Sequence, residues 1–156
     1  MNLFVEPCPG CFENQLQALS ERPGNPVFLS NGDFTLSRLI EAMSKQVYGG
    51  DLILAVYQLH DCTLTKIAEL QQSGMIGEVQ IVYDKENAQL STLNSQLKKS
   101  PNFVNLVSLR NGRRMMTVTG GWFSQSAGSL SKECYTMVND VETQHALRHV
   151  FERMFK

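Results

Sequence analysis

The stretch LILAVY, Leu52–Tyr57, limits the fold of this chain more than any other feature. It is apolar without interruption, so a strand formed here presents no polar face to water. Such a strand is stable only where both faces of its sheet are covered, as in sheets that lie between helices. The sequence therefore predicts a sheet with helices packed on it.

Segments on both sides of this strand alternate in type. Short β-branched or apolar runs at Val27–Ser30 and Glu78–Asp84 are typical of strands, and amphipathic segments lie between the three runs. Asp33 or Thr35 is expected to cap the first of these helices, and Asp61 or Thr63 the second. A third helix is expected from the spacing of Leu90, Leu93 and Leu97. The alternation predicts an α/β fold with a mixed, mostly parallel sheet flanked by helices.

The second half of the chain has a different pattern. The runs FVNLVSL and RRMMTVT flank Asn111–Gly112, a strong signal for a β-hairpin turn. A further strand, CYTMVN, precedes an amphipathic segment from Asp140 to Phe155, where Asp140 occupies the position of an N-cap.

Length and composition indicate one folded domain. The chain has 156 residues, of which 42% are hydrophobic and 19% charged, with a formal net charge of -1. We expect a short N-terminal arm with a helix over residues 1–26 and a main domain over residues 27–156. No run is apolar enough to span a membrane, and the start lacks the pattern of a signal peptide, so we expect a cytoplasmic protein without membrane contact.

The order of these elements resembles the phospholipase D-like family. The resemblance rests on LILAVYQLHDCTLTKIAEL, VQIVYD, the Asn111–Gly112 turn, Gly120, Glu133 and the closing helix, and it covers residues ~27 to 156 by element matching. It implies a phospholipase D-like half-unit. Single-unit members of that family pair two copies across their catalytic strands, so it also implies a homodimer.

The catalytic part of the family motif is missing. In that family a His in an H-x-K strand attacks phosphorus, but the three histidines here are His60, His145 and His149. None lies on the strand before Asn111. In the following G-S-x-N motif Gly120 matches, whereas Gly121 replaces Ser and Phe123 replaces Asn. We therefore expect no catalytic residue and a degenerate site, at Gly120, Gly121, Trp122, Phe123 and Glu133. Trp122 and Phe123 are interpreted as filling the vacated pocket or as stacking on a base or a partner.

A local group of cations suggests a binding role. Arg110, Arg113 and Arg114 bracket the predicted turn, and Lys98 and Lys99 precede the strand that leads to it. These side chains are candidates for binding phosphate, or they form a soluble hairpin tip that blunts edge pairing. The leading hypothesis is a catalytically degenerate domain that binds nucleic-acid phosphate or a protein partner as a homodimer.

Three alternatives remain at this stage. An altered phosphodiesterase or nuclease would use His60, Glu133 and either a loop Ser or Lys132. A redox or zinc role for Cys8 and Cys11 is less favoured than a turn at Pro9–Gly10, since no second ligand pair follows. A metal site on the last helix, at His145 and His149 with Glu142 and Glu152, is less favoured than a solvated helix face. We expect no metal and no cofactor.

Overall fold

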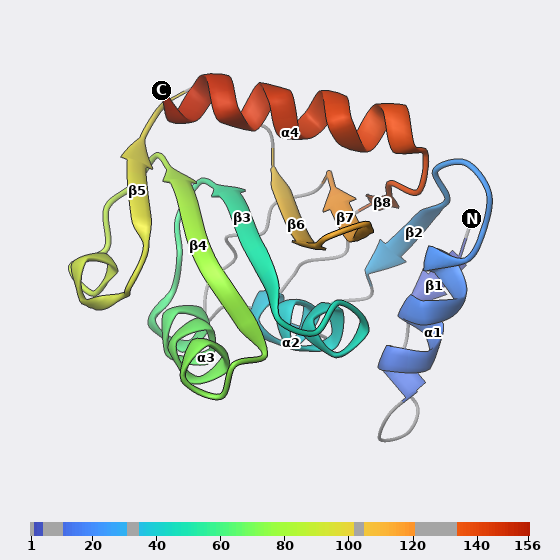
Figure 1. Cartoon of the computed structure of the whole chain (residues 1–156), viewed down its shortest axis with the longest axis horizontal. Helices are drawn as coiled ribbons and strands as arrows, with labels where there is room; N and C mark the ends of the chain where they lie inside the picture. The colour runs from blue at the N-terminus through green and yellow to red at the C-terminus, as the bar shows by residue number, and fades with distance from the viewer. Residues whose placement is uncertain (1, 5–10, 31–34, 102–104, 121–133) are drawn as a thin grey trace.

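An eight-stranded sheet runs through the molecule, with α1, α2 and α3 on one face and α4 alone on the other (Figure 1). The computed structural model describes residues 2–4, 11–30, 35–101, 105–120 and 134–156. The helices are α1 (Cys11–Ser20), α2 (Leu36–Gln46), α3 (Asp61–Gln72) and α4 (Val141–Phe155). The strands are β1 (Asn2–Phe4), β2 (Val27–Ser30), β3 (Gly50–Val56), β4 (Ile76–Tyr83), β5 (Gln96–Lys99), β6 (Leu106–Asn111), β7 (Arg114–Thr119) and β8 (Cys134–Met137). The α/β class expected from the sequence is confirmed.

The sheet is mixed, but the expectation that it is mostly parallel is wrong. Its order is β1-β2-β8-β7-β6-β3-β4-β5. Only β1–β2, β3–β4 and β4–β5 pair in parallel, whereas the four remaining pairs are antiparallel. The cause is that β6, β7 and β8 lie between β2 and β3 in the sheet, so these two strands never meet although only α2 separates them along the chain.

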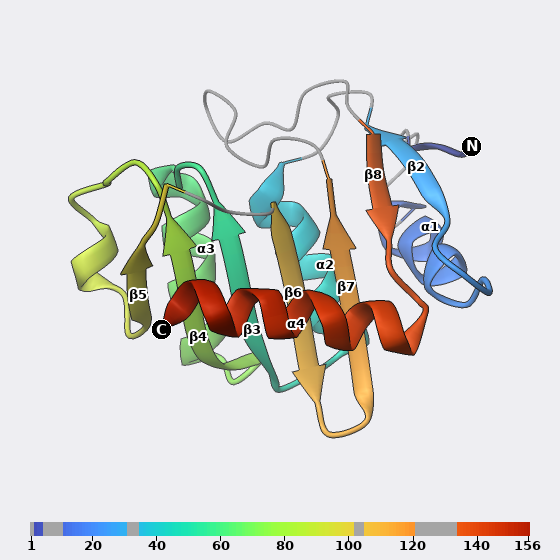
Figure 2. The same cartoon turned by 90° about the horizontal axis from the view of Figure 1, so that it is seen from above.

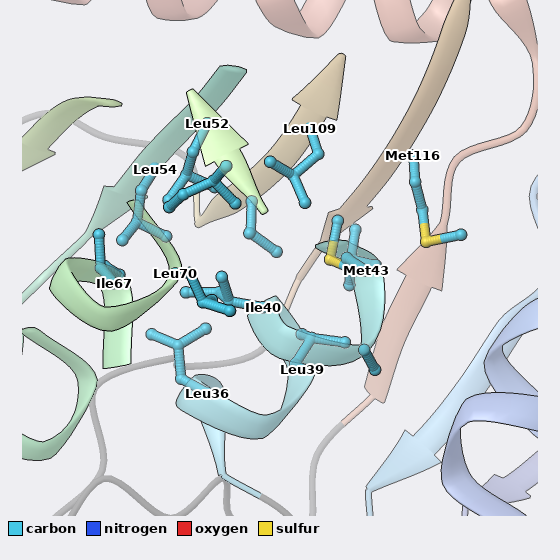
Figure 3. Close-up of a cluster of buried hydrophobic side chains, with 14 of the residues drawn as sticks. Leu36, Leu39, Ile40, Met43, Leu52, Leu54, Ile67, Leu70, Leu109 and Met116 are labelled. Atoms are coloured by element: carbon cyan, nitrogen blue, oxygen red, sulfur yellow. The ribbon is translucent and has the colours of Figure 1, made fainter. Parts of the chain in front are cut away.

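The strand β3 is covered on both faces, as its composition predicts. Leu52, Leu54 and Val56 belong to the core beneath α2 and α3, and Ile53 and Ala55 belong to the core beneath α4. Figure 3 shows residues of four further elements that belong to the same larger core as Leu52 and Leu54: Leu36, Leu39, Ile40 and Met43 of α2, Ile67 and Leu70 of α3, Leu109 of β6 and Met116 of β7.

Two predicted N-caps are present. The Thr35 side chain accepts a hydrogen bond from the Arg38 amide at 3.2 Å, and Asp140 Oδ2 accepts one from the Thr143 amide at 3.0 Å. The start of α3 differs from the expectation, because His60 occupies the cap position and Asp61 is the first helical residue.

The helix expected over Leu90, Leu93 and Leu97 is wrong. A single 3-10 turn (Leu90–Thr92) is followed by the strand β5, which pairs in parallel with β4. Short polar side chains close the turn locally, since Thr92 Oγ1 donates to the Gln89 carbonyl at 2.6 Å and the Gln89 amide donates to Asn87 Oδ1 at 2.8 Å. Such bonds compete with helix propagation, and the open edge of β4 then captures the following residues.

The N-terminal segment contributes to the same core. Phe12, Leu16 and Leu19 of α1 are buried in the cluster beneath the sheet. The strand β1, which the sequence pattern does not predict, pairs with β2. A division into an arm over residues 1–26 and a domain over residues 27–156 stays a prediction. No helix in the described part of the chain is both long and apolar enough to cross a membrane.

Candidate functional site

The candidate site residues lie at the two opposite ends of the strands. We call the edge where β3, β4 and β5 end the carboxyl edge, and the edge where β6 turns into β7 the hairpin edge. The pairings Ala55↔Leu106 and Leu106↔Thr119 place Gly120 at the carboxyl edge, and Asp51↔Arg110 places the β6–β7 turn at the opposite edge (Figure 2). The sites that the sequence predicts therefore lie at opposite ends of the strands.

At the carboxyl edge, β6 has no accessible nucleophile. The side chains of Leu106, Val107, Ser108 and Leu109 are all buried. Ser108 Oγ is hydrogen-bonded to Thr117 Oγ1 across the hairpin at 2.8 Å. The strand that the sequence resemblance aligns with the H-x-K strand of the phospholipase D-like family is thus part of the core.

Gly120 is the one degenerate-site position that the structure describes. Its φ is 94°, and its amide donates to the Asn105 carbonyl at 3.3 Å. Thr119 Oγ1 donates to the same carbonyl at 2.7 Å, so the end of β7 is fixed to the start of β6. Gly121, Trp122, Phe123 and Glu133 lie outside the described residues, and their assignment stays a prediction.

His60 lies at the same edge, between β3 and α3. Its Nε2 is buried and has no hydrogen-bond partner among the residues that the structure describes. The neighbouring Asn87 amide donates to the Leu59 carbonyl at 2.8 Å and to Asp61 Oδ1 at 2.9 Å, which holds the loop after β4 beside His60. Glu133 and Lys132, the expected companions of His60 in an altered active site, fall outside the described ranges.

The hairpin edge carries the arginines. Asn111 pairs with Arg114, so the turn is centred on Gly112 and Arg113, one residue later than the sequence pattern suggests. Gly112 has a φ of 61°, which suits glycine at the first central position of such a turn. Arg110, Arg113 and Arg114 are all exposed, and within the described part of the chain none of them forms an ion pair.

A hydrogen bond fixes the hairpin tip to the link between α2 and β3. Asn111 Nδ2 donates to the Tyr48 carbonyl at 2.8 Å. The next residue, Gly49, has a φ of 75° and donates its amide to the Met75 carbonyl at 2.9 Å. The Tyr48 residue is 61% exposed. Sequence reasoning did not single out Tyr48; the available signal was an aromatic residue between the end of a helix and a glycine pair.

On the α4 side, Arg110 faces a hollow of about 140 Å3 together with Arg148. Arg148 Nε donates to Met115 Sδ at 3.1 Å. Burial, followed by the charge of Arg110, lowers the pKa of Arg148 to about 10. Three carboxylates, Asp51, Glu78 and Glu152, line the same hollow. The acidic lining disfavours an anion here, so the cations best placed for phosphate are those on the tip itself.

Lys98 and Lys99 are not part of this group. They lie on the edge strand β5, where Lys99 pairs with Tyr83 at the carboxyl edge. Lys99 Nζ is 3.6 Å from Glu86 Oε1. The structure thus separates the two lysines from the three arginines that the sequence grouped with them.

Other surfaces offer less chemistry. A hollow of about 510 Å3 between α3 and the 3-10 turn has Asp61, Glu69, Gln72 and Gln89 in its lining, which contains no Lys or Arg. His145 and His149 are exposed on α4. The described residues contain no group of three or more His, Cys, Asp or Glu side chains placed to hold a metal.

No protein-family model and no curated protein matches the chain. Among the solved structures that match its fold is polyphosphate kinase from Porphyromonas gingivalis, with a TM-score of 0.50 and 13% identity; the match covers 89% of this chain and 20% of that one. Another is TrmBL2, an archaeal chromatin protein whose structure shows a novel mode of DNA binding. Its TM-score is 0.50 at 12% identity, and the match covers 90% of this chain and 56% of that one. The chain therefore spans a fifth of the polyphosphate kinase chain and just over half of the TrmBL2 chain. At such identities the likeness shows the fold alone.

Proposed function

We propose that this chain is a phospholipase D-like domain that has lost the family's catalysis and binds the phosphate backbone of nucleic acid through the β6–β7 hairpin. The observation that carries the proposal is the tip itself, where Arg113 and Arg114 are exposed and form no ion pair among the described residues. Free guanidinium groups are strong donors to phosphate oxygens.

Both fold neighbours are compatible with this role. One neighbour is a polyphosphate kinase, and the other, TrmBL2, is described as binding DNA. Loss of catalysis agrees with the buried strand β6, where the family places its nucleophile. The pairing of two copies implied by the family remains part of the proposal.

The test is a fluorescence-anisotropy titration of labelled DNA over a series of salt concentrations. We expect affinity to fall steeply with salt, because each phosphate contact releases condensed counterions. Arg113→Ala/Arg114→Ala should weaken binding about 10-fold or more at low salt and reduce the salt slope by about 1.5. Arg22→Ala/Arg153→Ala removes two exposed arginines elsewhere and should leave both quantities nearly unchanged.

Two outcomes would contradict the proposal. One is an absence of binding even at low salt, and the other is an equal loss of affinity in the two double variants. A loss confined to Lys98→Ala/Lys99→Ala would move the site to β5.

A second candidate function rests on His60. A buried imidazole nitrogen without a partner among the described residues, at the end of a parallel strand, is also a feature of sites that transfer protons. Hydrolysis of a nitrophenyl phosphodiester that persists through purification and is lost in His60→Ala would establish an altered phosphodiesterase instead.

A further inference from the structure

We infer that the hairpin edge recognises single-stranded rather than duplex nucleic acid, and that Tyr48 is the surface on which a base stacks. The inference rests on the proposed function, which it deepens by naming the ligand class. It starts from Tyr48, which the phosphate argument does not use.

Tyr48 is mostly exposed, although the residue before it is buried. The preceding residue, Val47, is the C-cap of α2 and is only 3% exposed, whereas Tyr48 is 61% exposed. A single exposed aromatic residue is common on protein surfaces and would mean little by itself. Its neighbours give it significance.

Asn111 places Tyr48 beside the arginine tip. Its side chain donates to the Tyr48 carbonyl at 2.8 Å, and its cross-strand partner is Arg114. Cross-strand partners share a face of the sheet, so Arg114 projects on the same face as the Asn111 side chain. The Tyr48 backbone and the Arg114 side chain therefore both adjoin Asn111, so an exposed aromatic residue and a cation occur side by side at the tip. Single-stranded nucleic acid is bound by this combination of an aromatic platform and positive charge.

The Tyr48 backbone is held before any ligand arrives. The Gly49 amide donates to the Met75 carbonyl at 2.9 Å and the Gly50 amide donates to the Val47 carbonyl at 3.1 Å, so bonds on both sides fix the link. A residue that is already ordered loses less conformational entropy on binding. These backbone hydrogen bonds favour a binding role for Tyr48 over a place in a mobile surface loop.

The chemistry selects a single strand. In a duplex the flat faces of the bases are stacked on one another, whereas an unpaired base can leave the stack and lie on an aromatic ring. Arg113 and Arg114 would contact phosphate in either ligand. Only the contact with Tyr48 distinguishes the two.

The experiment compares a labelled oligothymidylate of about 12 nucleotides with a duplex of the same length at about 50 mM salt. Tyr48→Ala should lower the affinity for the single strand about 10-fold and change the affinity for the duplex less than about 2-fold. Tyr48→Phe should stay within about 2-fold of the original protein, because stacking requires the ring and not the hydroxyl. Thermal melting of each variant controls for folding.

Tyr57→Ala is the matched comparison, since Tyr57 is 37% exposed but lies at the end of β3, near the carboxyl edge. The inference is overturned if Tyr48→Ala leaves the single-strand affinity unchanged or lowers the affinity for both ligands equally. It is also overturned if Tyr57→Ala lowers the single-strand affinity more than Tyr48→Ala does. If both ligands bind equally and still depend on Arg113 and Arg114, the proposed function stands and this inference fails. If neither ligand binds, both fail.

Discussion

At the scale of single residues, the side chain of Asp51 on β3 fills the space where Gly77 on β4 would carry a Cβ. A Cβ at this position would lie 2.5 Å from Asp51 Oδ1, which is closer than a real Cβ contact allows. The same oxygen accepts a hydrogen bond from the Glu78 amide at 2.9 Å. We expect Gly77→Ala to displace the carboxylate and lower the free energy of unfolding by about 1.5 kcal/mol, measured by urea denaturation.

The cause is tested by a double-mutant cycle. In an Asp51→Ala background the obstacle is gone, so adding Gly77→Ala should cost much less than it does alone. Equal costs in the two backgrounds would show that the side chain of Asp51 is not what excludes a Cβ.

The ion pair between Glu41 and Lys66 joins α2 to α3 and makes stability depend on pH. Lys66 Nζ lies 2.7 Å from Glu41 Oε2. This hydrogen bond lowers the pKa of Glu41 below its ordinary 4.5 and raises the pKa of Lys66 above its ordinary 10.5. The stabilisation is therefore complete between these values. It is lost as pH falls through the folded-state pKa of Glu41, or rises through that of Lys66.

We expect Glu41→Gln to lower the free energy of unfolding by about 0.5–1 kcal/mol at neutral pH, because both side chains are partly solvated. The difference from the original protein should vanish in acid and in strong alkali. Denaturation at several pH values measures it, with Glu69→Gln as control, since Glu69 is the more exposed carboxylate near Lys66. A difference that does not vary with pH would contradict the ionic origin.

At the scale of elements, α4 is attached to the sheet by one fully buried aromatic residue. Phe151 is 1% exposed and packs with Ile53, Ala55, Val82 and Leu106. Phe151→Ala should lower the free energy of unfolding by about 3–5 kcal/mol through lost contacts and a cavity. The adjacent Val150→Ala, at a position 39% exposed, should cost less than about 1 kcal/mol.

Chemical denaturation provides the measurement. If Phe151→Ala does not fold, Phe151→Leu keeps the comparison open, because it should still cost more than Val150→Ala. Similar losses of unfolding free energy in the two variants would mean that α4 does not pack on the sheet through Phe151.

Elements were predictable where their signals are local. Thr35 and Asp140 act through atoms three residues away, and the burial of β3 follows from its own composition. The structure of the segment Leu90–Leu97 was not predictable in this way. Its three leucines are spaced as in an amphipathic helix, but a 3-10 turn followed by a strand packs the same leucines against the core. The choice between helix and strand depends on pairing with β4, and nothing in the local sequence of the segment reports that pairing.

At the scale of the whole molecule, the sheet order could not be read from the sequence. The alternation of strands and helices in the first half favours β2 beside β3, but the hairpin and β8 occupy that place. The candidate site follows the same division. Its arginines were visible in the sequence as a cluster around a turn. That Tyr48 lies beside this turn was not visible, because Tyr48 and Asn111 are more than sixty residues apart and are joined by one hydrogen bond.

The homodimer implied by the resemblance to the phospholipase D-like family is a prediction about the whole molecule. Light scattering coupled to size-exclusion chromatography measures it directly. We expect twice the mass of the chain, and a mass that is unchanged in Arg113→Ala/Arg114→Ala, because single-unit members of the family that the sequence resembles pair across their catalytic strands rather than at a hairpin tip. A monomer would remove the pairing from the proposal but leave the nucleic-acid test intact.

The outermost strands of the sheet have a consequence for how the protein behaves when concentrated. β1 has three residues and β5 has four, and β5 exposes Lys98 and Lys99. A second molecule that added a copy of β5 to this edge would bring lysines close to lysines along a very short ladder. We therefore expect the β5 edge to offer little template for growth into fibrils, with Lys98 and Lys99 opposing ordered aggregation there.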